Sequence, residues 1–128
     1  MQRITLMGVG AFSIGTAVYI WAATLHWYNN VPGVVLTGPL NMHLAKDVAL
    51  AYLASGIGLV WAGLKHDRSV GVLGASWLVF HAIFHMGMWM HRGFPLDYIA
   101  FVNLVGIQFP SFLALFLAIN IQTERGKT

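Results

Sequence analysis

Histidine and aspartate side chains recur at helical spacing in two stretches of the sequence. His43 and Asp47 are four residues apart, and so are His81 and His85. Residues four apart lie on one face of an α-helix. Imidazole nitrogens and carboxylate oxygens are ligands for zinc, copper, iron and nickel, and such ligands on facing helices build sites inside helical bundles. These four residues predict a metal site, if two helices present them to each other.

Neighbouring residues bear on which cofactor the site would hold. His26, just beyond the first apolar stretch, is a candidate fifth ligand. Three of the five residues after His85 are methionines, and thioethers favour Cu(I). Two imidazoles can also ligate a haem, so His81 and His85 are candidate ligands of haem b as well. We expect a transition metal, copper or zinc, ahead of haem.

Four of the five candidate ligands also have a structural interpretation. Asp47 follows a candidate N-cap, Asn41, closely enough for the helix dipole to favour its charge. His26 and His43 stand near the ends of apolar stretches, where water could solvate them. His81 lies inside an apolar stretch, where its role would be structural if it forms a hydrogen bond to a neighbouring helix. Both interpretations stay open at this point.

The composition predicts an integral membrane protein. Of its 128 residues, 58% are hydrophobic and 9% are charged, whereas a soluble domain carries roughly 25% charged residues. Four apolar stretches each approach the ~20 residues that cross a bilayer, and crossing segments must be helical to satisfy their backbone. We expect one all-α domain, residues 1–128, forming a four-helix transmembrane bundle with spans at about 4–25, 43–64, 70–90 and 98–121.

The same composition limits the partners and the chemistry. The chain has no cysteine, which excludes disulfides and thiolate ligands. It has no basic cluster with interleaved aromatics, so nucleic acid is not an expected partner. No phosphate loop or nucleophile arrangement is present, and whether the protein is an enzyme stays open. The expected partners are the lipid bilayer and either other membrane subunits or further copies of the chain in a homo-oligomer.

Basic residues set the expected orientation. Five of the seven fall on the side that holds both termini, namely Arg3, Lys65, Arg68, Arg125 and Lys127. The positive-inside rule places that side in the cytoplasm. We therefore expect a multi-pass protein of a bacterial inner (plasma) membrane with both termini cytoplasmic. Five of the six histidines then belong to the non-cytoplasmic half.

The connections predict how the spans are placed. The turn at 65–68 is short, which indicates antiparallel neighbours. Counting outward at ~1.5 Å per residue brings Asp47 to the depth of His85, with His81 about one turn deeper. Asp47 and His85 would then form the centre of a site that opens to the non-cytoplasmic face. The segment 26–41, rich in Gly, Pro and Asn, predicts an irregular re-entrant or surface-lying loop.

Two features concern the shape of the helices. Gly8, Gly10 and Gly15 in the first span would let a neighbouring helix approach closely, or they are ordinary membrane-helix composition. Pro110 in the fourth span predicts a kink, with the Ser111 hydroxyl satisfying a freed backbone group.

The two middle spans resemble a known group of proteins. The segment 41–53, NMHLAKDVALAYL, is followed one helix later by HAIFH at 81–85. This pair of motifs resembles small four-span bacterial membrane proteins, broadly DoxX-like, in which N-x-H-x-x-x-D on the second helix accompanies H-x-x-x-H on the third. Members often carry an acid shortly after the second histidine, where this chain has none between 86 and 90. The group has no settled activity, so the resemblance implies the fold and the polar residues alone.

Three functional hypotheses follow. The first is a metal- or haem-binding membrane protein with its site in the non-cytoplasmic half of the bundle. The second is a non-catalytic subunit or assembly factor of a larger membrane complex, since the loops are short and the sequence shows no soluble domain. The third is a small transporter or proton pathway, because ionisable residues inside a membrane usually serve function.

Overall fold

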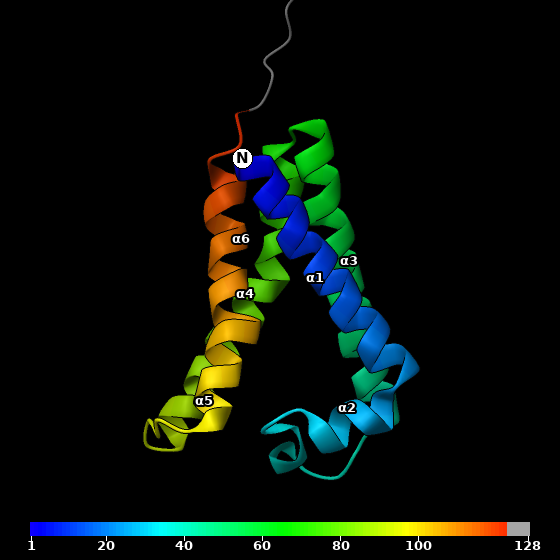
Figure 1. The fold of residues 1–128 in the computed structure, drawn as a ribbon, viewed down its shortest axis with the longest axis vertical. Helices are drawn as coiled ribbons and strands as arrows, with labels where there is room; N and C mark the ends of the chain where they lie inside the picture. Colours follow the sequence, from blue (N-terminus) through cyan, green and yellow to red (C-terminus); the bar gives the residue numbers. More distant parts are fainter. Residues whose placement is uncertain (123–128) are drawn as a thin grey trace, which may run out of the picture.

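The computed structural model describes residues 1–122, and every regular element among them is helical (Figure 1). In chain order the elements are α1 (Gln2–Ala22), α2 (Thr24–Asn30), the 3-10 helix η1 (Val34–Thr37), α3 (Met42–Lys65), α4 (Arg68–His91), α5 (Tyr98–Asn103), the π-helix η2 (Leu104–Gln108) and α6 (Phe109–Ile119). Helices α1, α3, α4 and the continuous run 98–119 are long and apolar enough to cross a membrane. The predicted all-α fold with four apolar spans is confirmed.

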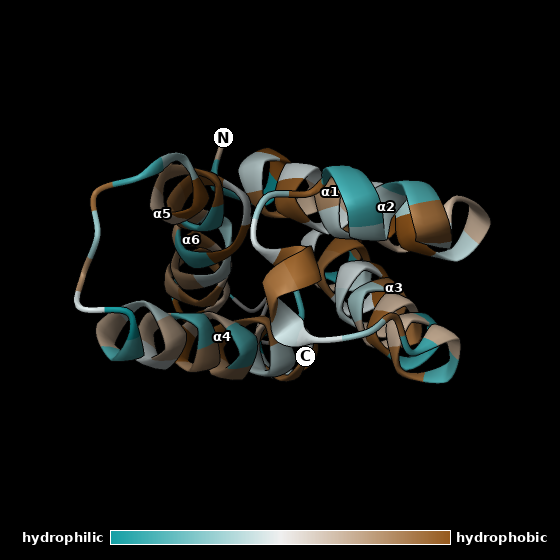
Figure 2. Ribbon diagram, turned by 90° about the horizontal axis from the view of Figure 1, so that it is seen from below, coloured by the Kyte–Doolittle hydropathy of each residue, from teal (hydrophilic) through white to brown (hydrophobic). Residues whose placement is uncertain are grey.

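The spans pack mainly against their neighbours in the chain. α1 lies along α3, α3 along α4, and α4 along α6, while a smaller contact between α1 and α6 closes the bundle. Met1, the turn at His66 and the end of α6 lie together, and we call this the turn end (Figure 1). α2, η1 and the connection between α4 and α5 lie at the opposite, loop end (Figure 2). Which end faces the cytoplasm stays a prediction, and Arg125 and Lys127 lie outside the described residues.

Asparagine and aspartate side chains cap the N-termini of three helices. Asn41 accepts a hydrogen bond from the Leu44 N–H at 3.1 Å, which confirms it as the N-cap of α3. Asp67 caps α4 in the same way and Asp97 caps α5. Such caps satisfy backbone donors that the first turn of a helix leaves unpaired. The polar residues at 41, 67 and 97 therefore fix where the membrane-crossing helices begin.

Close backbone contacts at glycine residues hold the middle of the bundle together. A Cβ atom at Gly10 would lie 2.8 Å from the Gly56 carbonyl oxygen, and one at Gly58 would lie 3.2 Å from the Gly74 Cα. Only glycine lets helix backbones approach this closely, a common way of packing helices in membranes. The predicted close approach is confirmed at Gly10, whereas a Cβ atom added at Gly8 or Gly15 would meet nothing within 4 Å.

The spans diverge toward the loop end. In Figure 1, α1 with α3 and α4 with α5 and α6 form two arms that separate there. The first predicted span, 4–25, is interrupted because α1 ends at Ala22 and α2 starts at Thr24 in a new direction. The loop predicted as irregular contains two short helices, α2 and η1, lying across this end.

A π-helix stands directly before Pro110 in the fourth span, where the sequence predicts a distortion. Proline has no N–H and its ring clashes with the carbonyl four residues before it. The backbone avoids this by widening over η2, where the N–H of Phe109 bonds to the carbonyl of Leu104 five residues earlier. The Ser111 hydroxyl donates to the carbonyl of Ile107, whereas the carbonyl that loses its usual partner at Pro110 is that of Gly106.

Candidate functional site

His43 and Asp47 pair with each other at the loop end of α3. Their Nε2 and Oδ2 atoms are 3.4 Å apart, and their side chains are 90% and 55% exposed. No contact to the histidines of α4 accompanies this pair in the described part of the chain. The nearby Lys46 folds over the ring of Trp21, with its Nζ 4.2 Å from the ring centre. These residues therefore form a polar surface where α3 meets α1.

His26 lies apart from the other candidate ligands. Its Nδ1 is 2.7 Å from the hydroxyl of Tyr19, seven residues earlier in the chain. The two rings meet edge to face, with centres 5.8 Å apart. This bond spans the break between α1 and α2, so it fixes the angle at which the chain leaves the first span.

His81 and His85 form a second pair of candidate ligands that the structure brings together. Their ring centres are 4.6 Å apart on one face of α4. The ring of His81 stacks on Trp77 at 4.8 Å with an angle of 11° between the planes, and it meets the edge of Tyr52 from α3. Tyr52 in turn contacts Trp77 edge to face. The packing of three rings therefore holds His81 in one orientation.

The Nδ1 atom of His85 is buried and has no hydrogen-bond partner in the described part of the chain. More than nine in ten buried polar groups in proteins have a partner. Leaving one unpaired costs about 1–3 kcal/mol, and the penalty is larger in lipid than at a wet surface. Among the candidate ligands in the described part of the chain, His85 is thus the residue with a buried ring nitrogen that lacks a hydrogen-bond partner.

The five predicted ligands do not form one cluster. Across residues 1–122, no group of three or more His, Cys, Asp or Glu side chains is arranged to hold a metal ion. His43 with Asp47, His26 with Tyr19, and His81 with His85 form separate contacts. The register predicted for α3 and α4 is confirmed where Gly58 meets Gly74. Tyr52 still contacts His81 beyond that point. The arms diverge further toward the loop end, which carries the α3 pair away from α4.

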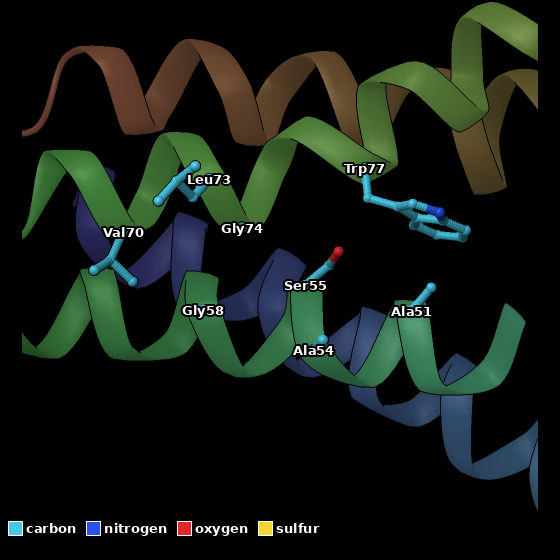
Figure 3. A pocket seen from close by; sticks show the side chains of 8 residues that line it. All are labelled: Ala51, Ala54, Ser55, Gly58, Val70, Leu73, Gly74 and Trp77. Carbon is cyan, nitrogen blue, oxygen red and sulfur yellow. The ribbon is translucent and has the colours of Figure 1, made fainter. Parts of the chain in front are cut away.

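A groove between α3 and α4 begins beside the histidine pair. It encloses about 420 Å³ and is lined mainly by small and apolar side chains of both helices (Figure 3). Among the described residues, Ser55 supplies its only hydroxyl group and no ionisable side chain lines it. Trp77 lines this groove and also stacks on His81. Sequence reasoning passed over Trp77 and Tyr52, although Trp77 stands four residues before His81 and so shares its face of α4.

A second pocket, of about 280 Å³, lies where α4 approaches α5 and η2 at the loop end. Its lining comprises Trp89, Leu96, Asp97, Ala100, Phe101, Asn103, Leu104 and Gln108. Asp97, which lines this pocket, forms an ion pair with Arg92. Hydrogen bonds from the Ala100 N–H and then from Arg92 hold the pKa of Asp97 below its usual range.

The chain has no match among known families and structures. No protein-family model, no curated protein and no solved structure matches it. The site must therefore be interpreted from its own chemistry.

Proposed function

We propose that the chain binds a transition metal ion, copper or zinc, through His81 and His85 in the non-cytoplasmic half of a membrane. The remaining ligands come from another chain, so that the protein acts as a metal-binding subunit of a membrane assembly. His43, Asp47 and His26 are not part of this proposed centre, because each has a partner elsewhere.

The observation that carries the proposal is the unpaired Nδ1 of His85. A metal ion would satisfy a ring nitrogen of this residue, and neutral imidazole is a ligand for zinc, copper, iron and nickel. Two histidines four apart on one helix are a known arrangement for holding a metal ion. The stack of His81 on Trp77 supports the proposal further, because a ring held in place loses less entropy on binding.

The number of ligands supports the role as a subunit. Zinc sites use three or four protein ligands, and the described residues offer two imidazoles in one place. A partner chain would have to supply the others.

The shared face also favours a metal ion over haem. Two axial imidazoles of one haem approach from opposite sides of the ring, whereas His81 and His85 lie on the same face of α4.

Metal binding to purified protein in lipid nanodiscs tests the proposal. We expect wild-type protein to bind copper or zinc in a competition titration with a chelator, and His85→Ala to bind at least tenfold more weakly. His43→Ala is the matched control, because it removes an imidazole of the same half that the proposal does not use. Equal metal affinity of His85→Ala and wild type, with helicity intact, would refute the proposal.

Native mass spectrometry of the loaded sample tests the subunit role. One metal ion shared by two chains, or retained only with a co-purified partner, is the expected result. A full complement of one tightly held ion per isolated single chain would show that the chain alone completes the site, and it would refute the subunit role while leaving metal binding in place.

A further inference from the structure

The pocket between α4, α5 and η2 contains two polar side chains that the protein itself does not use. Trp89 lines the pocket, and its indole N–H donates to the carbonyl of Pro95 at 2.9 Å. The Asp97 carboxylate accepts from Ala100 and pairs with Arg92. The carboxamides of Asn103 and Gln108 also line the pocket, and neither makes a hydrogen bond to another side chain or backbone group of the described residues. These two amides are the free polar groups of the pocket.

The π-helix places both amides on one side. In an α-helix, residues five apart are separated by about 140° around the axis, because each residue turns by about 100°. In a π-helix the hydrogen bonds join residues five apart, so those residues stand nearly above one another. Asn103 and Gln108 are five apart across η2 and line the same pocket. Single π-turns of this kind are frequent at functional sites.

Gln108 is deep in the membrane span and hidden from solvent. Its exposed fraction is 8%. It lies ten residues after Tyr98, the first residue of the span, which corresponds to a depth of about 15 Å at 1.5 Å per residue. That depth is near the middle of a hydrocarbon core of about 30 Å. An amide N–H without a partner at this depth is costly, so a ligand that accepts a hydrogen bond from it lowers that cost.

We propose that this pocket binds an uncharged ring compound bearing a carbonyl group, dissolved in the bilayer core, through hydrogen bonds donated by Asn103 and Gln108. A carbonyl oxygen accepts from carboxamide N–H groups, and the compound carries no donor of its own to leave unpaired in lipid. The aromatic side chains of Trp89 and Phe101 line the pocket beside the amides and can pack against a flat ring.

Depth and charge exclude the carbonyls of ordinary phospholipids. Ester carbonyls lie at the boundary of the hydrocarbon core, near the level of the Arg92–Asp97 pair just before the span, and not at the level of Gln108. The two charges of that pair neutralise each other, so the pocket has no unpaired charge for an ionised headgroup. The proposed occupant is therefore an uncharged molecule that dissolves in the hydrocarbon core.

Infrared spectroscopy with benzophenone labelled with ¹³C at the carbonyl tests the proposal. Benzophenone is an uncharged, lipid-soluble ring ketone, and a hydrogen bond lowers the frequency of its carbonyl stretch. We expect wild-type protein in nanodiscs to produce a shifted, saturable carbonyl band. Gln108→Leu and Asn103→Leu should each weaken binding at least fivefold. Asn120→Leu, which replaces an exposed amide that bonds to its own helix, should bind like wild type.

Two results would overturn the proposal. The first is a carbonyl band identical to that in protein-free nanodiscs, which would mean simple partitioning into lipid. The second is an unchanged shifted band in Asn103→Leu, which is less prone to misfold than Gln108→Leu because Asn103 is only partly buried. Ultraviolet cross-linking of the bound ketone should label peptides containing residues 96–108. The His81→Ala/His85→Ala double variant should keep the shifted band, which separates this site from the proposed metal centre.

Discussion

The turn end and the loop end of the bundle are built on opposite principles. At the turn end and in the middle, glycines let backbones touch, and side chains such as Leu6 and Leu59 are fully buried. Toward the loop end the arms separate, and the histidine pair, the free amides and the second pocket all occur there. This contrast indicates that close backbone contact at the turn end and in the middle fixes the helices. The loop end can then hold unpaired polar groups.

The largest expected effect comes from disturbing the close contact itself. Gly10→Ala places a Cβ atom against the backbone of Gly56 and the Val60 side chain, and overpacking of this kind costs about 1–3 kcal/mol. Gly8→Ala is the matched control on the same helix, because nothing lies within 4 Å of its added atom. Reversible unfolding in mixed micelles measures both variants. Equal stability of the two would contradict the role given to the glycine contact.

Removing the cause of the π-helix sharpens the comparison at the loop end. Pro110→Ala restores an N–H that can bond to the carbonyl of Gly106, so η2 should relax to an α-helix. Asn103 and Gln108 would then point about 140° apart, and benzophenone affinity should fall at least threefold with helicity retained. The shifted carbonyl band reports the outcome, and an undiminished band would show that the π-turn does not align the amides.

A smaller effect is expected from the cap of α3 at the loop end. Asn41→Ala removes the acceptor for the Leu44 N–H, and loss of such a cap costs about 0.5–2 kcal/mol. Hydrogen exchange of the first turn of α3 should accelerate, while exchange near Gly56 stays slow because the glycine contact is untouched. Faster exchange along the whole helix would argue that the two halves are not independent.

The smallest expected effect is a local response to acid. The pKa of Asp97 is lower in the folded protein than in the unfolded chain, chiefly through the Ala100 N–H and then Arg92. Its contribution is therefore present above the unfolded pKa and is lost as the pH falls through the folded pKa. Acidification should loosen the start of α5 before the rest, as read from amide signals of Ala100, and Asp97→Asn should remove this pH dependence. A start of α5 that stays equally ordered at acid pH would contradict the assignment.

The sequence predicts the helices better than it predicts the site. Length and hydropathy suffice for four spans, because a bilayer demands about 20 apolar residues in helical form. Asn41 could be identified as a cap and Pro110 as a distortion from their residue types alone. The equal depth of Asp47 and His85 also follows from counting, but depth does not determine distance. The arms diverge beyond the contact of Tyr52 with His81, and His43 and Asp47 pair with each other instead of with α4.

The second pocket was beyond prediction for a different reason. Asn103 and Gln108 stand five apart, a spacing that places them on different faces of any α-helix. Only the π-turn brings them to one side, and a proline indicates a distortion without specifying its form. Trp77 and Tyr52 went unrecognised because an aromatic residue in an apolar helix usually packs in the core, as Tyr52 also does here.

The order in which the helices contact one another has a consequence for synthesis. α1 packs on α3, α3 on α4, and α4 on α6, so each span meets its main partner as soon as it enters the bilayer. The chain can therefore assemble one hairpin at a time during insertion, without waiting for distant segments. The last span carries η2, and its arrival completes the amide pocket and brings α6 against α1. A nascent chain halted before residue 98 would hold the histidine pair without the pocket.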